Sequence, residues 1–292
     1  MFAKLISDMM IKPGSSPVFG SPTDFGLEFE AVEFPTEDGV TLRGWLIDGG
    51  SDKVVVQTHF GVQCSRSGYS PRGKGLIKMW KDDISFLRQA KHLSEQGYSV
   101  LMYDMRNHGE SERGDCPWIS WGPKEAADVI AAVDFVTGHA RLGAASIGLL
   151  SICMGAAATT YAYGLGQAGL QSRVNVKALM AVQPLHYREF TKAFGIPGFL
   201  NNAGTRLSTE RLGFDLNDKT FLSDVHAISV PTLVVQNRND PWTDLDFVQS
   251  FHDKLRVEKE LSWLDLTKKR AAAYDHLGTS PEIISSFFGK HL

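Results

Sequence analysis

The sequence has few cysteines and little net charge. Its 292 residues contain three cysteines, Cys64, Cys116 and Cys153, an odd number without paired spacing. This excludes a disulfide framework and a paired-cysteine zinc site, and it favours a reducing, cytoplasmic compartment. The formal net charge is −3, from 30 basic and 33 acidic residues. Such a balance, without runs of like charge, argues against nucleic acid or an anionic membrane surface as a partner.

Long apolar runs and cofactor motifs are missing as well. No apolar run approaches the roughly 18 residues of a membrane helix, and Met1 to Ile11 lacks the apolar core and cleavage site of a signal peptide. No histidine or cysteine pair has metal-ligand spacing, and no glycine-rich dinucleotide fingerprint occurs. We therefore expect no metal, no cofactor, no membrane and a small-molecule ligand. The oligomeric state is left open, a homodimer included.

Short β-rich runs alternate with helical segments along most of the chain. A hairpin is predicted first, because the β-rich segments 27–34 and 40–47 flank an Asp-Gly pair. Nearly continuous apolar runs, typical of strands buried on both faces, follow at 54–56, 99–103, 147–152, 176–182 and 232–235. Helical patterns separate them, at 83–96, 124–137 and 155–163. The order predicts an α/β fold with a mostly parallel central sheet and helices on both faces.

One interval interrupts this alternation. Residues 186–227 contain no clear strand but several aromatic and apolar residues. Long insertions of this kind are often lids over an active site. The predicted division is therefore a core of residues 1–185 and 228–292 and a lid of residues 186–227. The alternative is that residues 186–227 form an insertion that packs on the protein surface without acting as a lid.

Cys153 stands where an apolar strand meets a helix of small residues, in the segment Ile147 to Ala158. At that junction the first N–H groups and the positive dipole end of the helix favour the thiolate. The segment resembles the Gly-x-Ser-x-Gly nucleophile elbow of the α/β-hydrolase superfamily, with Cys153 in place of the serine and Ser151 in place of the first glycine. The resemblance implies that the chain adopts the α/β-hydrolase fold and carries a small lid. The alternative reading of Cys153 is a buried structural cysteine.

The resemblance also implies an acid and then a base after the nucleophile. Asp240 follows the apolar strand 231–236, which is the acid's place, and His276 follows the strand-like stretch 260–264 and precedes a terminal helix. We therefore predict a triad of Cys153 as nucleophile, His276 as general base and Asp240 as orienting acid.

Two further motifs resemble loops of the same superfamily. The oxyanion hole needs two backbone N–H groups, and the resemblance assigns them to Met154, after the nucleophile, and to Phe60, in a strand followed by His-Phe-Gly. His59 is expected to order that loop by hydrogen bonding. The segment Asp104 to Ser111 resembles the family's Asp-x-Arg-Gly-His-Gly-x-Ser, with Asn107 replacing a glycine, and is expected to be structural.

The stretch 61–80 contains four basic residues and no acid: Arg66, Arg72, Lys74 and Lys78. We interpret Arg66 and Arg72 as candidate ligands for a carboxylate or phosphate of the substrate, the alternative being a solvated basic loop. Aromatic residues predicted around the mouth suggest an apolar acyl pocket, with Tyr69 and Trp242 as the substrate-binding candidates. The others are Trp118, Trp121, Phe194 and Phe199.

Attack of the Cys153 thiolate on an acyl carbon would give an acyl-thioenzyme. The Cys-Asp-His set is similar to that of dienelactone hydrolases and polyhydroxyalkanoate synthases, while the layout looks closer to the peptidase-like esterase and acyltransferase branch. Serine is usual there, and the sequence leaves open whether Cys153 is natural or a replaced serine. The predicted function is hydrolysis of an ester, lactone or thioester. Acyl transfer or cyclisation, and a non-catalytic protein that binds a small ligand, are the alternatives.

Overall fold

The computed structural model describes residues 2–76, 78–218 and 220–292. Within them, one sheet of eight strands runs in the order β1-β2-β6-β3-β7-β8-β9-β10. The bounds are β1 (Phe29–Pro35), β2 (Thr41–Ile47), β3 (Lys53–Thr58), β6 (Ser99–Tyr103), β7 (Ser146–Ile152), β8 (Val176–Val182), β9 (Thr232–Asn237) and β10 (Lys259–Leu264). A separate ribbon pairs β4 (Gly68–Tyr69) with β5 (Ile84–Ser85).

The strand directions confirm the predicted architecture. β1 pairs with β2, and β2 with β6, in antiparallel fashion. The remaining pairs, from β6 across to β10, are parallel. The Asp-Gly pair lies in the β1–β2 turn, where Gly39 adopts a φ of 83°, which glycine does at little cost. The chain is thus a mostly parallel α/β sheet with an antiparallel hairpin at one edge.

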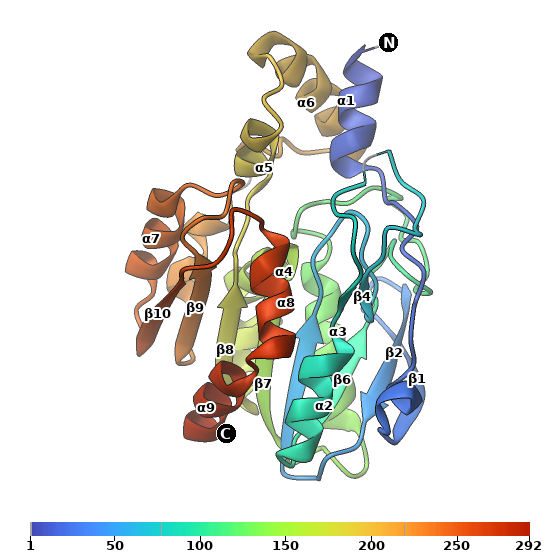
Figure 1. Cartoon of the computed structure of the whole chain (residues 1–292), viewed down its shortest axis with the longest axis vertical. Coiled ribbons are helices and arrows are strands. Elements are labelled where there is room, and N and C mark those ends of the chain that lie inside the picture. The colour runs from blue at the N-terminus through green and yellow to red at the C-terminus, as the bar shows by residue number, and fades with distance from the viewer. Residues whose placement is uncertain (1, 77, 219) are drawn as a thin grey trace.

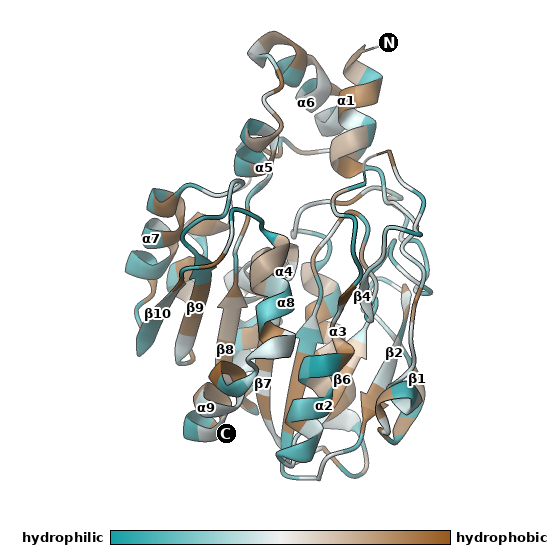
Figure 2. Ribbon diagram, viewed as in Figure 1, coloured by the Kyte–Doolittle hydropathy of each residue, from teal (hydrophilic) through white to brown (hydrophobic). Residues whose placement is uncertain are grey.

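Helices cover both faces of the sheet (Figure 1): α2, α8 and α9 lie in front of it, and α3 and α4 behind. Their bounds, with α7 beside β10, are α2 (Leu87–Glu95), α3 (Ala126–Gly138), α4 (Met154–Gly164), α7 (Leu245–Lys254), α8 (Ala271–Thr279) and α9 (Glu282–His291). Short 3-10 turns lie at Pro22–Phe25, Gly166–Ala168, Leu170–Ser172, Phe221–Ser223 and Val225–Ala227. Because helices shield both faces, β6, β7 and β8 are buried almost throughout, while the edge strand β10 is half-buried. Figure 2 shows the same contrast between brown central strands and a teal β10.

Three helices form a cap at the carboxyl end of the parallel strands (Figure 1): α1 (Phe2–Ile11), α5 (Tyr187–Ala193) and α6 (Gly198–Leu212). The last two belong to the predicted insertion, whereas α1 is a helix that the sequence did not predict. Gly204 of α6 lets α1 approach closely, since a Cβ there would lie 2.4 Å from Ile6 Cγ2. Arg211 of α6 also pairs with Asp8 of α1 at 2.7 Å. None of the helices in the described ranges is long and apolar enough to span a membrane.

Candidate active site

Cys153 sits at a strained turn between β7 and α4, with φ 55° and ψ −108°. Side chains with a Cβ rarely adopt such angles, and they persist where the surrounding structure enforces them. Gly155 is required next to it, because a Cβ there would lie 2.6 Å from the Thr58 carbonyl oxygen. Ser151 fits where the superfamily has glycine, since its hydroxyl lies 2.8 Å from that of Thr159. The strand, turn and helix predicted around Cys153 are therefore present.

Asp240 follows β9 and is buried beside a guanidinium. Its Oδ2 forms a short ion pair with Arg270 Nη1 and accepts a hydrogen bond from Gln236 Nε2 at 3.2 Å. Its Oδ1 accepts a hydrogen bond from the Trp242 N–H at 3.1 Å. Among the residues that the structure describes, no imidazole donates to this carboxylate. Arg270 thus occupies the place in which the triad expects a histidine.

Arg270 is 1% exposed and all of its guanidinium nitrogens have partners. Nε donates to the Tyr274 hydroxyl at 2.7 Å, Nη1 also donates to Thr243 Oγ1 at 3.0 Å, and Nη2 donates to the carbonyl of Gln183. Gln183 itself is strained, with a φ of 46°. Burial alone would lower the pKa of Arg270, but the charge of Asp240 raises it above its ordinary value. The guanidinium therefore remains a fixed positive charge.

Cys153 lies close enough to Arg270 and Tyr274 to act on both electrostatically, and Tyr274 lines the same cavity as Cys153. Arg270 and Tyr274 are four residues apart, so they share one face of the helical turn that leads into α8. A guanidinium can only donate, and the Tyr274 oxygen therefore accepts the bond from Nε and retains its own proton. Burial raises the pKa of the Tyr274 hydroxyl well above its ordinary value, so this proton stays in place at neutral pH.

The structure does not bring His276 to Cys153 and Asp240. His276 lies within α8, two residues after Tyr274, and a step of two residues turns a side chain by about 200° around a helix. Its half-buried side chain therefore leaves α8 away from the face that carries Tyr274. The sequence placed His276 between the strand-like stretch 260–264 and a terminal helix, and it predicted no helix over residues 271–279. The run Ala271-Ala272-Ala273 is the signal for a helix that could have corrected it.

The loop after β3 is held by His59, as predicted. His59 Nε2 accepts the Met105 N–H at 3.0 Å, and Nδ1 lies 2.6 Å from the Phe60 carbonyl oxygen, to which it donates. Burial, followed by the nearby His108, lowers the pKa of His59 to about 3, so the ring is neutral at neutral pH and is only a weak base.

The two predicted oxyanion donors differ in their surroundings. In the described part of the chain, the Met154 N–H at the start of α4 donates to no other protein atom. Near Phe60, burial raises the pKa of the Cys64 thiol, and the Phe60 N–H acts on that pKa in the opposite direction. Its neighbour Gly61 lies directly against Met154, because a Cβ at Gly61 would be 2.5 Å from the Met154 sulfur. The backbone amide of Gly61 is therefore a further candidate oxyanion donor beside Met154, and the sequence analysis did not identify it.

Three of the four predicted substrate-binding residues lie outside the cavity at Cys153. Arg66 is 5% exposed and is engaged by Asp104 and Glu110, with its guanidinium 4.4 Å above the Trp45 ring. Arg72 is exposed and pairs with Asp83 at 3.1 Å. Both guanidiniums therefore form ion pairs with acidic residues of the same chain. Their acidic partners lie outside the stretch 61–80, so the local sequence did not reveal them.

Aromatic side chains enclose Cys153: Phe60, Trp80, Trp121, Phe190, Trp242 and Tyr274. Trp242, the fourth candidate, stacks on Trp80 with ring centres 5.7 Å apart. Tyr69 acts indirectly, because its hydroxyl donates to the Trp80 carbonyl at 3.0 Å and accepts the Trp80 N–H at 3.2 Å. The cavity beside Cys153 measures about 10 Å³, about the space of one water molecule. A substrate can enter only after part of this cover moves.

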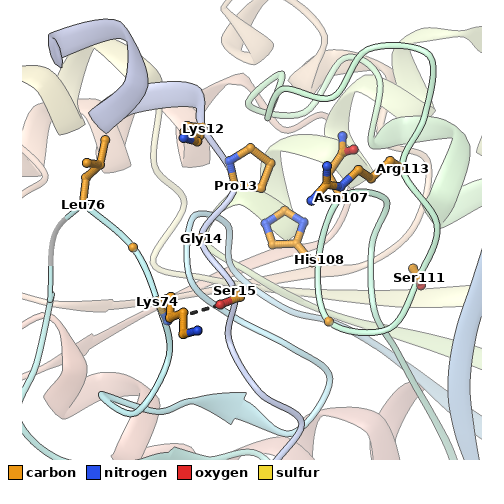
Figure 3. Close-up of a pocket in the computed structure, with 12 residues that line it drawn as sticks. Lys12, Pro13, Gly14, Ser15, Lys74, Leu76, Asn107, His108, Ser111 and Arg113 are labelled. Atoms are coloured by element: carbon orange, nitrogen blue, oxygen red, sulfur yellow. Dashed lines mark hydrogen bonds between the residues drawn. The ribbon is translucent and has the colours of Figure 1, made fainter.

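A second cavity of about 420 Å³ lies where the chain entering from α1 passes two loops (Figure 3). Three cationic residues line it, Lys12, Lys74 and Arg113, and none of them forms an ion pair with another described residue. Lys74 is the member of the predicted basic stretch that faces a cavity. This cavity and the one at Cys153 have no lining residue in common.

Comparison with known proteins agrees with this architecture. Residues 75–195 match the family described as the alpha/beta hydrolase fold. The esterase Pf2001 of Pyrococcus furiosus is similar in structure, with a TM-score of 0.69, 24% identity and 96% of each chain covered. A dienelactone hydrolase from Anabaena variabilis has a TM-score of 0.56 and 16% identity, over 91% of this chain and 99% of that one. No curated protein matches the sequence. The predicted α/β-hydrolase fold is confirmed.

Proposed function

We propose that this α/β-hydrolase-fold protein is a cysteine-dependent acyl-group enzyme that cleaves an ester, lactone or thioester through an acyl-thioenzyme on Cys153. The observation that carries the proposal is the position of Cys153 in the strained turn at the start of α4, within electrostatic range of the buried Arg270 guanidinium. A neighbouring cation and the positive end of a helix dipole both favour a thiolate. Once ionised, a cysteine sulfur can attack an acyl carbon without a histidine to remove its proton.

The remaining groups have roles that follow from their contacts. The Met154 and Gly61 N–H groups would stabilise the oxyanion of the tetrahedral intermediate. Asp240 would hold Arg270 in position and balance its charge. Tyr274, which lines the cavity with Cys153, would help to hold the Arg270 guanidinium through its hydroxyl oxygen. Collapse of the intermediate expels the leaving group and leaves the acyl group on Cys153.

The closed cavity and the displaced His276 favour one second candidate, a non-catalytic protein that binds a small ligand. A satisfied Arg270–Asp240 pair under an aromatic cover is also what a purely structural cluster would contain. The two candidates differ in the reactivity of Cys153, because a packed neutral thiol resists alkylation whereas a thiolate does not.

Intact-protein mass spectrometry tests the proposal. The protein is incubated with p-nitrophenyl esters, simple lactones and acyl thioesters, and separately with iodoacetamide at mild pH. We expect one acyl adduct and one rapid alkylation, both mapped to Cys153 and both absent in Cys153→Ala. The half-buried Cys116 is the matched control, because Cys116→Ala should retain both. An unreactive Cys153 with every donor and with iodoacetamide would favour the binding protein.

A further inference from the structure

We propose that the acyl chain held on Cys153 lies in an outer groove that Trp80 separates from the thiol, and that this groove selects apolar acyl chains. The inference rests on the proposed acyl-thioenzyme and specifies the acyl group that it carries. The outer groove is a cavity of about 590 Å³ between residues 79–84 and the start of α8. Its volume falls within the range of small-molecule pockets, roughly 300–1,000 Å³.

An acyl group bonded to Cys153 needs space that the cavity at the thiol does not offer. A leaving group departs, but the acyl chain stays on the sulfur until the second half of the reaction. The space at the thiol, about 10 Å³, matches a single water molecule, so even a short chain has to extend beyond it. Met79 and Trp80 line both this cavity and the outer groove. Displacing these two side chains therefore joins the thiol to the groove.

Trp80 is the part of the aromatic cover that is best placed to move. Its side chain is half-buried, whereas four other rings of the cover are at most 4% exposed: Phe60, Trp121, Phe190 and Tyr274. Met79 and Trp80 also lie outside the helices and strands. The Tyr69 hydroxyl holds both the carbonyl and the N–H of Trp80. The backbone is thus anchored while the ring can turn about its own side-chain bonds.

The walls of the outer groove suit an apolar chain. Its apolar residues come from both sides: Met79, Trp80, Ile84, Ala271 and Ala272. Its charged residues are two lysines and three aspartates. Asp83 and Asp275 are already paired with arginines outside the groove. The remaining two positive charges and one negative charge create no strong field of one sign, so the groove favours an apolar chain over a polyanionic one.

Alkyl methanethiosulfonates test the route, because they leave an alkyl chain on the sulfur in the place of an acyl chain. Methyl and octyl reagents are applied at about pH 9, where a thiol with an ordinary pKa near 8.5 is mostly ionised, so access decides the rate. Modification of Cys153 is followed by peptide mass. Trp80→Ala should raise the octyl rate at least about 10-fold. The reason is that contacts of Trp80 with four other aromatic rings no longer have to break.

Trp263→Ala is the matched control for the loss of a tryptophan. Trp263 is half-buried as well, but it lies on the edge strand β10, so its variant should react with the octyl reagent like the parent. No rise in Trp80→Ala, or an equal rise in Trp263→Ala, would overturn the inference. A larger rise in Phe190→Ala would place the route beneath α5 and would overturn it too.

Ala272→Trp fills the outer groove from α8 and tests the acyl chain itself. Acylation of Cys153 by p-nitrophenyl octanoate and by p-nitrophenyl butanoate is compared by intact mass. Burial of each CH₂ group gains about fourfold, and the parent should therefore prefer octanoate at least about 10-fold. Ala272→Trp should lose this preference. Ala140→Trp adds the same ring at an exposed position after α3 and should keep it.

The groove and the proposed function fail on different results. Equal acylation by the two esters in the parent, or an unchanged preference in Ala272→Trp, would show that the outer groove does not hold the acyl chain, while the acyl-thioenzyme would stand. If neither ester acylates Cys153 although the thiosulfonates give the expected pattern, the proposed function is wrong and the route past Trp80 is not.

Discussion

Breaking the buried pair between Arg270 and Asp240 should destabilise the protein strongly. Both side chains are 0% exposed, and removing one member of such a pair leaves the other charge buried without compensation. The cost is about 3–5 kcal/mol. Arg270→Met keeps the apolar stem and deletes the charge, and Asp240→Asn keeps an oxygen for the Trp242 N–H. Each single variant should therefore lose an amount in this range.

The double variant Arg270→Met/Asp240→Asn provides the decisive comparison. It contains neither charge, and replacing a whole buried pair by neutral groups costs far less than removing half of it. We expect the double variant to be about 3 kcal/mol more stable than the sum of the two single losses predicts. Urea unfolding, followed by fluorescence and circular dichroism, measures the free energy of each of the four proteins.

An exposed pair supplies the control. Arg72 and Asp83 lie 3.1 Å apart with side chains 67% and 43% exposed, and pairs of this kind contribute about 0–1 kcal/mol. Arg72→Met should change the free energy of unfolding by no more than that. Strict additivity of Arg270→Met and Asp240→Asn would refute the reasoning, because it would mean that the two charges do not compensate each other in the folded state.

Three further outcomes follow from particular contacts. Burial lowers the pKa of His59 to about 3, so only the unfolded chain binds this proton below roughly pH 6.5, and stability should fall there by about 1.4 kcal/mol per pH unit. Urea unfolding at several pH values measures this dependence. In His59→Gln the free energy of unfolding should depend on pH less steeply than in the parent, by the equivalent of about one proton. Gly155→Ala, whose Cβ would lie 2.6 Å from a carbonyl oxygen, should cost about 1–3 kcal/mol. At Gly138 an added Cβ would have no atom within 4 Å, so Gly138→Ala should raise the free energy of unfolding by about 0.4–1 kcal/mol. Equal changes in the melting temperatures of Gly155→Ala and Gly138→Ala would contradict this difference. Gly204→Val should push α1 away at Ile6 and raise the rate of Cys153 alkylation, and an unchanged rate would separate α1 from access to the site.

Much of the sheet could be predicted because its strands are buried on both faces. The segments 99–103 and 176–182 were predicted with the bounds that the structure has, since a continuous apolar run ends where the helical cover ends. Asn107 illustrates a local rule. It replaces a glycine of the family motif and adopts a φ of 64°, which asparagine tolerates better than most residues. Such features depend on neighbours in the chain and are visible in the sequence.

The parts that could not be predicted depend on residues far apart in the chain. Arg66 pairs with Asp104, 38 positions later, and Arg270 pairs with Asp240, 30 positions earlier. Nothing in the local pattern distinguishes these arginines from solvated ones. The resemblance to a triad also directed attention to His276, because histidine is the base that the motif order requires. The contacts of the acid and the nucleophile, rather than their order in the chain, indicate the group that acts between them.

A guanidinium in place of an imidazole changes what the site can do. An imidazole gains and loses a proton near neutral pH, so it can relay protons to and from water. Arg270 keeps its proton at every accessible pH, so it can stabilise a thiolate continuously but cannot act as a base. The aromatic cover restricts the access of water to Cys153, and under the proposed function this would slow the hydrolysis of an acyl group held there. Under the proposed function, the charge of Arg270 and the closed cavity would therefore both lengthen the lifetime of an acyl group on Cys153.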